Sequence, residues 1–143
     1  MSAAGEFSWR IRVYWEDTDG GGVVYYANYL KFMERARTEW LRSLGHSQHE
    51  IAEQFGYVFA VAEAHVNYRK PARLDDDLTV TCLPVHEGRA SIRFKQTIIR
   101  KSDSRPDTLI ADGEVRVVCV DAKSFRPRAL PDFIQPAKVN DGQ

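Results

Sequence analysis

One stretch of helical periodicity, flanked by segments that alternate with period two, most constrains how this chain can fold. Between residues 28 and 44 apolar side chains recur at spacings of three and four, which predicts an amphipathic helix of about 17 residues, roughly 25 Å long. Its apolar stripe consists of Tyr29, Phe32, Met33, Ala36, Trp40 and Leu44. Asn28 is expected to cap the helix and Gly45 to end it. A second, shorter helix is predicted for Ser47–Phe55.

Five segments alternate between apolar and polar side chains, as strands with one buried face do. They are Phe7–Trp15, Val58–Arg69, Asp77–Val85, Arg89–Ile99 and Leu109–Asp121. Connections at 86–88 and 101–107 join three of them as successive hairpins. One strand, one long helix and then hairpin-linked strands form an α+β pattern. An antiparallel sheet curved around the long helix would bury the apolar face of every element.

The length of 143 residues suits one domain. We expect a single domain over residues 1–143, with a core from about residue 7 to about residue 131. The C-terminal tail, which contains Pro127, Pro131 and Pro136, is expected to extend over the surface. A partner subunit would bury further surface, so an oligomer is expected from size alone.

The charge balance excludes bulk electrostatic binding as the main activity. Twenty basic and 20 acidic side chains give a formal net charge of zero, so neither nucleic acid nor an anionic membrane is attracted by the overall field. No apolar run approaches the ~20 residues that span a bilayer. Residues 1–7 lack the basic and apolar regions of a signal peptide. These features predict a cytoplasmic protein without a transmembrane segment or a nucleic-acid partner.

The cysteines and histidines point to no metal or redox chemistry. Cys82 and Cys119 each lie inside a predicted strand, where small buried hydrophobic residues are more common than redox or nucleophilic groups. None of the four histidines forms a pair with the spacing of zinc hydrolases. We therefore expect neither a metal nor a cofactor.

The loop between the first strand and the long helix carries the residues best suited to chemistry. Asp17 and Asp19 precede three glycines, Gly20 to Gly22, and the backbone of Gly22 is expected to approach a substrate closely. A helix start presents unpaired N–H groups and a positive dipole end, so a carboxylate just before it lies beside an oxyanion hole. Asp19 is the candidate catalytic residue. The alternative is that both aspartates only shape a turn, as most turn aspartates do.

The same Asp-x-Asp-Gly segment permits two other interpretations. In phosphatases of the haloacid dehalogenase family such a segment follows a strand, and its first Asp is the nucleophile. That fold needs a parallel sheet with alternating helices, and this chain has one substantial helix. A calcium loop is the second interpretation, but Gly21 stands where a third oxygen ligand belongs and Asn28 where a bidentate Glu belongs.

A longer motif is more specific than any of these. Residues 13–41, VYWEDTDGGGVVYYANYLKFMERARTEWL, resemble the signature of the 4-hydroxybenzoyl-CoA thioesterase family, most closely its bacterial branch associated with the Tol-Pal system. PARLDD at 71–76, VCVD at 118–121 and PRALP at 127–131 resemble the same branch. This similarity runs over nearly the whole chain, from Arg10 to Pro131. It implies a hotdog fold and the hydrolysis of an acyl-CoA thioester to a free acid and CoA.

The resemblance also implies roles for individual residues. Asp19 corresponds to the family's catalytic carboxylate, acting as nucleophile or as general base for water. The backbone N–H of Tyr26 corresponds to the contact that polarises the thioester carbonyl. Arg89 corresponds to a basic residue that holds the nucleotide phosphate of CoA. Its neighbours are uncharged in this chain, so Lys70 or Arg93 are alternatives for that contact.

Two further correspondences bear on the acyl group. Glu34 matches a carboxylate that contacts a hydroxyl of the acyl group, although a helix glutamate paired with Thr38 or Arg37 is the more common arrangement. Tyr26 stands where the Tol-Pal branch usually has His, so no imidazole is available for acid–base catalysis at that position. Neither the length of the acyl chain nor its aliphatic or aromatic character follows from the sequence.

Active sites of this family lie at an interface formed by edge-to-edge pairing, so the resemblance implies a homodimer, or a homotetramer made from two dimers. A link to the Tol-Pal system or to lipid metabolism is implied by the resemblance alone. A non-catalytic hotdog protein that binds acyl chains or partners is the alternative function. The presence of Asp19 beside the glycine-rich loop favours an enzyme, and the Asp-x-x-x-x-His pair of the hydratase hotdogs is absent.

Overall fold

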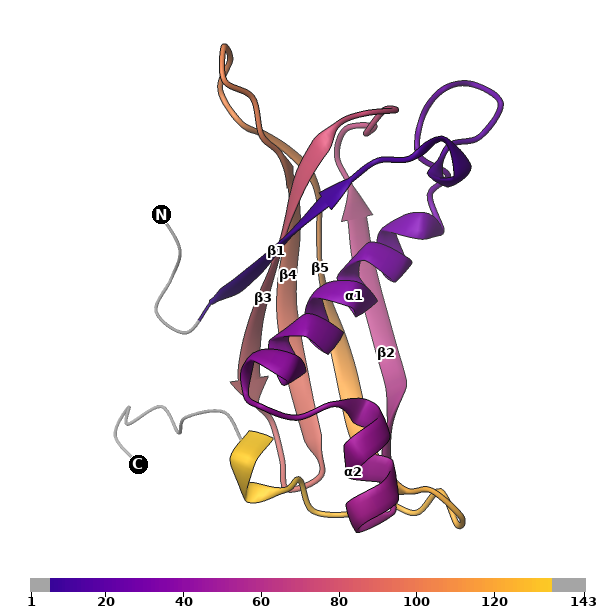
Figure 1. The fold of residues 1–143 in the computed structure, drawn as a ribbon, viewed down its shortest axis with the longest axis vertical. Helices are drawn as coiled ribbons and strands as arrows, with labels where there is room; N and C mark the ends of the chain where they lie inside the picture. Colours follow the sequence, from indigo (N-terminus) through magenta and orange to yellow (C-terminus); the bar gives the residue numbers. More distant parts are fainter. Residues whose placement is uncertain (1–5, 135–143) are drawn as a thin grey trace.

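The computed structural model describes residues 6–134, apart from the side chain of His86. Within this range one sheet of five strands curves around a long helix (Figure 1). The elements in chain order are β1 (Phe7–Arg12), a short 3₁₀ helix (Trp15–Asp17), α1 (Asn28–Ser43), α2 (Gln48–Phe55), β2 (Tyr57–Tyr68), β3 (Asp77–His86), β4 (Ser91–Arg100), β5 (Thr108–Asp121) and a second 3₁₀ helix (Asp132–Ile134). Neither α1 nor α2 is long and apolar enough to cross a membrane.

The sheet is antiparallel throughout, with strand order β1-β3-β4-β5-β2. Its register aligns the apolar residues that face α1. Val80 lies opposite Ile98, which lies opposite Ala111, and all three are buried. The predicted α+β architecture is therefore confirmed, and the four later strands begin within two residues of their predicted positions. A sheet of antiparallel strands excludes the alternating helices and parallel strands of a haloacid dehalogenase.

Helix α1 buries one stripe against the concave face of the sheet. Its buried residues are Tyr29, Phe32, Met33, Ala36 and Leu41. Burying each large apolar side chain stabilises the fold by about 1.5–3 kcal/mol. Trp40 is half-buried, with its ring edge to face against Phe94. Leu44, predicted for the stripe, is exposed because the helix ends at Ser43 and the chain turns away at Gly45, where φ is +93°.

The ends of α2 have the capping residues typical of helices, whereas the start of α1 does not. Ser47 caps α2 by accepting the N–H of Glu50, and Gly56 ends that helix with a left-handed φ of +70°. The prediction that Asn28 caps α1 is wrong. Ala27 occupies the N-cap position, and the Asn28 side-chain amide donates instead to the carbonyl oxygen of Asp17, at 2.9 Å.

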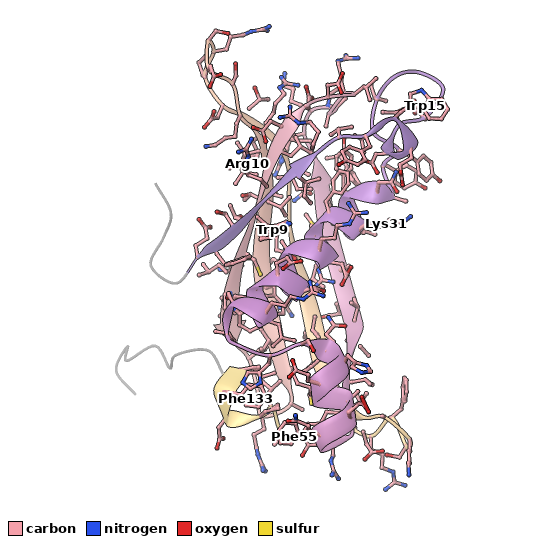
Figure 2. All side chains as sticks on the ribbon, viewed as in Figure 1. Trp9, Arg10, Trp15, Lys31, Phe55 and Phe133 are labelled. Carbon is pink, nitrogen blue, oxygen red and sulfur yellow. The ribbon has the colours of Figure 1, made fainter. Side chains whose placement is uncertain are left out.

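The first strand is shorter than its alternation predicts. β1 ends at Arg12, and Trp15 begins a 3₁₀ helix in which its side chain is 79% exposed (Figure 2). The cause is a local hydrogen bond, since the carboxylate of Asp17 accepts the N–H of Tyr14 at 2.8 Å. This bond turns the chain before Trp15 can continue the strand.

The C-terminal segment packs against the core and does not run extended as expected. Leu130 and Ile134 are buried, and the Leu130 N–H donates to the carbonyl oxygen of Arg89 at 2.8 Å. Phe133 stacks on His46 with ring centroids 3.7 Å apart. The core thus continues to Ile134, and Pro136 lies outside the described residues.

Both cysteines are buried free thiols. Burial raises the pKa of Cys82 to about 12 and that of Cys119 to about 11, because a thiolate is poorly solvated there. Neither is a nucleophile at neutral pH. The prediction that they act as small buried hydrophobic residues is confirmed.

Candidate active site

The loop before α1 folds into a small hairpin around Asp19. Thr18 and Val24 form an antiparallel bridge, and the Asp19 N–H donates to the Val23 carbonyl oxygen at 2.9 Å. Gly22 adopts φ +83°, a left-handed conformation that a residue with a Cβ adopts only with strain. The glycine therefore fixes the turn that presents Asp19.

Asp17 anchors this hairpin to the start of α1. Its side chain is only 9% exposed, and its carbonyl oxygen accepts both the Tyr25 N–H, at 3.0 Å, and the Asn28 side-chain amide. On the other side of the loop, the Val24 N–H donates to the carbonyl oxygen of Ala72 at 2.8 Å. The loop is thereby held between α1 and the segment that leads into β3.

Asp19 is exposed, and its two carboxylate oxygens differ. Oδ1 accepts the N–H of Gly21 at 2.7 Å, which orients the group. Oδ2 has no hydrogen-bond partner among residues 6–134. One oxygen is thus held in place while the other is available to attack a carbonyl or to accept a proton from water.

The start of α1 offers an unpaired donor in the same loop. The N–H groups of Tyr25 and Asn28 are used, by Asp17 and by Tyr25 respectively. The Tyr26 N–H has no acceptor in the part of the chain that the structure describes. It stands at the positive end of the α1 dipole, where a developing oxyanion is stabilised.

The Tyr26 side chain belongs to an exposed aromatic cluster above this donor. It is 61% exposed, and its ring centroid lies 5.0 Å from that of Tyr25 and 6.1 Å from that of Tyr68. Tyr29, beneath, accepts the N–H of Ala72 with its hydroxyl at 3.0 Å. The cluster thus presents three exposed tyrosine rings, those of Tyr25, Tyr26 and Tyr68, where the Asp19 loop leads into α1.

Arg89 is not near Asp19 in the same chain. It lies in the turn between β3 and β4, outside the strand predicted to contain it. Asp19 lies at the end of the sheet where β3 begins, whereas Arg89 follows the end of β3 (Figure 1). Ten strand residues at about 3.3 Å each separate these ends by roughly 30 Å.

The two alternative phosphate-binding cations, Arg93 and Lys70, differ in whether a carboxylate already pairs with them. Arg93 is engaged by Glu87 at 2.5 Å, by Glu63 at 3.2 Å and by Glu114 at 3.4 Å, on the sheet face opposite α1. Hydrogen bonding to Glu87 raises its pKa. Lys70 is exposed, lies at the Asp19 end of the sheet just before Ala72, and has no ion-pair partner among the described residues.

The sequence reasoning missed Arg73. Its backbone forms a bridge with Val23 of the Asp19 loop, and its exposed side chain has no partner within residues 6–134. The signal was present, because Arg73 lies in the PARLDD motif at 71–76. With Lys70 it supplies two free positive charges at the end of the sheet that carries Asp19.

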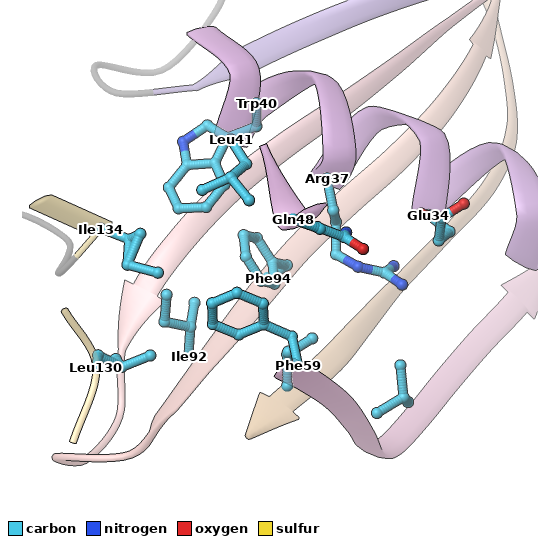
Figure 3. A pocket seen from close by; sticks show the side chains of 12 residues that line it. Glu34, Arg37, Trp40, Leu41, Gln48, Phe59, Ile92, Phe94, Leu130 and Ile134 are labelled. Carbon is cyan, nitrogen blue, oxygen red and sulfur yellow. The ribbon is translucent and has the colours of Figure 1, made fainter. Parts of the chain in front are cut away.

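Glu34 lies on the exposed side of α1, where its carboxylate accepts the Thr38 hydroxyl at 2.5 Å. It also lines the rim of a cavity of about 140 Å³ between α1, α2 and the sheet (Figure 3). No group of three or more His, Cys, Asp or Glu side chains in residues 6–134 could hold a metal ion.

Comparison with known proteins identifies the family. A profile described as thioesterase-like superfamily matches residues 13–137. Acyl-CoA thioester hydrolase YbgC from Escherichia coli O6:H1 is 46% identical over 129 residues, which cover 90% of this chain and 92% of that protein. Acyl-CoA thioesterase YbgC from Haemophilus influenzae is 40% identical over 131 residues, covering 92% and 93%.

Solved structures share the fold. A 1,4-dihydroxy-2-naphthoyl-CoA thioesterase from Synechocystis matches with a TM-score of 0.82 and 25% identity, over 90% of this chain and 92% of that one. For 4-hydroxybenzoyl CoA thioesterase from Pseudomonas sp. strain CBS-3 the TM-score is 0.79 at 19% identity, over 89% and 93%, which shows the fold alone. The hotdog fold predicted from the sequence is confirmed, and the chain belongs to the thioesterase-like superfamily as a thioester hydrolase.

Proposed function

We propose that this protein hydrolyses acyl-CoA thioesters to a free acid and CoA, with Asp19 driving the attack on the carbonyl. The observation that carries the proposal is the asymmetry of the Asp19 carboxylate, with one oxygen held by Gly21 and the other unpaired beside a helix start. The relatives at 46% and 40% identity, named acyl-CoA thioester hydrolase and acyl-CoA thioesterase, support the substrate class.

The proposed chemistry begins with the thioester carbonyl accepting the free N–H of Tyr26. That donor stabilises negative charge on the oxygen as the carbonyl is attacked. Asp19 either takes a proton from the attacking water or attacks directly and forms an acyl anhydride that water then opens. In the first route Asp19 passes the proton of the water to the sulfur as the carbon–sulfur bond breaks, and CoA leaves as its thiol. In the second route CoA leaves as a thiolate that takes a proton from solvent, and water then opens the anhydride to the free acid and the Asp19 carboxylate. Orienting the carboxylate and the carbonyl in one site supplies several kcal/mol.

A homodimer through β2 is part of the proposal. β2 is an edge strand of 12 residues, and Val61 in its middle is 54% exposed. Long apolar edges are covered or paired in folded proteins. β1, at the other edge, has six residues and carries Arg10, which is ion-paired with Asp77 at 2.7 Å. β2 is therefore better suited than β1 to pair with a second chain, because it is longer and its exposed middle residue is apolar and not charged.

A two-fold pairing of β2 strands would complete the site. It would run the strands antiparallel, so the β2 start of one chain would meet the β2 end of the other. The turn that carries Arg89 lies at the β2 start, because Ala90 pairs with Cys119 and Cys119 with Phe59. We therefore propose that Arg89 of the partner subunit holds the CoA phosphates at the Asp19 site, with Lys70 and Arg73 as further cations.

The remaining features of the proposal are the location, the assembly and the acyl contacts. A cytoplasmic enzyme is supported by its two reduced, buried thiols. We propose one domain over residues 1–143, a tetramer as a pairing of two dimers, Gly22 as a backbone contact to substrate and Glu34 as a contact to an acyl hydroxyl.

The test is release of thiol from a panel of acyl-CoA thioesters that includes short aliphatic, long aliphatic and aromatic acyl groups. Turnover of at least one thioester is expected, with no hydrolysis of p-nitrophenyl phosphate. Binding of acyl-CoA without turnover of any of them would identify the non-catalytic alternative and overturn the proposal.

A further inference from the structure

The cavity between α1, α2 and the concave face of the sheet has a polar mouth and an apolar floor (Figure 3). Glu34 and Gln48 are the exposed polar residues at the mouth, and Val61, on the proposed dimer edge, lies beside them. The floor consists of the buried side chains of Ile92, Phe94, Leu130 and Ile134. A ligand that fits this cavity has a polar head and a short apolar tail.

Arg37 provides the polar group inside this cavity. Its guanidinium donates one hydrogen bond, from Nη1 to Oε1 of Gln96 at 3.0 Å. No carboxylate among residues 6–134 lies within ion-pairing distance of it, and the nearby Glu34 is bound to Thr38. Burial lowers the pKa of Arg37, which reflects the poor solvation of its charge.

The remaining guanidinium N–H groups are open to a ligand. No side-chain nitrogen or oxygen atom of the described residues is both fully buried and unpaired. The unpaired nitrogens of Arg37 therefore face accessible space, and Arg37 lines the cavity. A guanidinium presents parallel N–H donors that match the two oxygens of a carboxylate. Glu34 stays at the exposed rim, where solvent screens its repulsion.

We propose that this cavity binds a short-chain monocarboxylate, with the carboxylate on the free N–H groups of Arg37 and the alkyl tail on the apolar floor. A cavity of about 140 Å³ is close in size to those that hold one benzene molecule, so a chain of roughly six carbons fits. The proposal rests on the proposed function only for the origin of the ligand, since each thioester hydrolysis releases one carboxylate.

Calorimetric titration with three six-carbon probes tests the head and the tail separately. Hexanoate is expected to bind, and hexan-1-ol, which lacks the charge, to bind about tenfold or more weakly. Adipate is expected to bind more weakly than hexanoate because its second carboxylate would meet the apolar floor. Equal affinity for hexanoate and hexan-1-ol, or tighter binding of adipate, overturns the proposal.

Variants locate the site. Arg37→Met should weaken hexanoate binding about tenfold or more, since it deletes the cation and leaves an apolar side chain. Gln96 keeps its bonds from Nε2 to the carbonyl oxygens of Met33 and Thr81, so the surrounding structure retains its anchor. Arg42→Met is the matched control, because Arg42 lies on the exposed side of α1 and pairs with Glu39. It should bind hexanoate as the wild type does.

Arg37→Gln serves as a second variant if Arg37→Met does not fold, since it keeps a hydrogen-bond donor and lacks the charge. Its hexanoate affinity should fall to the level of hexan-1-ol binding by the wild type. Unchanged affinity in either variant contradicts the carboxylate site. Hexanoate binding by a protein that hydrolyses no thioester would reject the proposed function and leave this site in place. Hydrolysis of a thioester without binding of hexanoate would support the proposed function and reject the carboxylate site.

Discussion

At the residue scale, Asp17 and Asp19 lie two positions apart, but Asp17 holds the loop in place and Asp19 is the candidate catalytic group. The carboxylate of Asp17 is buried and accepts the Tyr14 N–H, while its carbonyl oxygen holds the start of α1. Asp19 is exposed and leaves one oxygen unpaired. The hairpin between Thr18 and Val24 separates these roles, since it turns Asp19 outward from a position that Asp17 secures.

Two substitutions at Tyr26 distinguish its backbone N–H from its phenol. Tyr26→Phe deletes only the hydroxyl and should keep most of the activity. Tyr26→Pro deletes the N–H, and kcat should fall by roughly a hundred- to a thousandfold, the usual cost of one oxyanion donor. Proline is tolerated near a helix start, so the fold should survive.

Steady-state kinetics on both variants provide the measurement, with circular dichroism and light scattering to confirm that each matches the parent. An inactive Phe variant beside an active Pro variant would make the phenol the catalytic group. The mechanism would then run through a proton from Tyr26 and not through the helix start.

At the element scale, β5 and β2 approach closely at Gly113. A Cβ added there would lie 2.2 Å from the backbone oxygen of His65, a contact that only a shift of the strand could relieve. Gly113→Ala should therefore lower the free energy of unfolding by about 2–4 kcal/mol. Gly20→Ala is the matched control, since nothing lies within 4 Å of its Cβ position. Urea unfolding curves of the two variants provide the comparison, and equal midpoints would contradict the close packing of these strands.

The elements themselves could be predicted from local patterns. Period-two alternation located β3, β4 and β5, and three- and four-residue spacing located α1, because both patterns record one buried face. The predicted ends of two elements were wrong where a side chain makes a hydrogen bond to the backbone that the periodic pattern does not include. Asp17 ends the first strand early by accepting the Tyr14 N–H, and Asn28 leaves the cap position to bind Asp17. Neither hydrogen bond has a periodic signature.

The candidate site could be predicted from the sequence where its residues are close along the chain, and not where their proximity depends on the fold. Asp19 and Tyr26 lie in one continuous motif, so the sequence alone brought them together. Arg89 was assigned to the same candidate site, and within one chain it lies at the far end of the sheet, because strand length and hairpin order decide which ends meet. Its assignment therefore depends on the pairing of two chains, which the sequence pattern does not determine. Arg37 was noted only as a partner for Glu34, since its place in the cavity depends on α2 and the tail packing across the sheet.

At the scale of the whole molecule, the exposed edge of β2 predicts a homodimer. Light scattering at micromolar concentration should give twice the mass of the chain, or four times that mass if two dimers associate. Val61→Lys, which places a charge at the middle of that edge, should shift the population toward monomer. A monomeric wild-type protein would remove the basis for a site shared between subunits.

A mixing experiment tests whether each site draws on both chains. Asp19→Asn and Arg89→Ala should each have little activity at substrate concentrations well below KM. If subunits exchange freely, about half of the dimers are mixed, and one of their two sites combines an intact Asp19 with an intact Arg89. The mixture should then recover roughly a quarter of the wild-type activity. Activity no higher than the average of the two separate variants would contradict a site that joins Asp19 of one chain to Arg89 of the other.

The most direct measurement is thiol release from the best acyl-CoA substrate by the wild type and by Asp19→Asn. The substitution keeps the shape of the side chain and removes its charge, so the turnover number should fall by several orders of magnitude, while CoA binding measured by calorimetry stays within a few fold. Asp103→Asn, in the exposed loop between β4 and β5, is the control and should match the wild type. An Asp19→Asn protein that turns over near the wild-type rate would contradict the assignment of Asp19 as the group that drives hydrolysis.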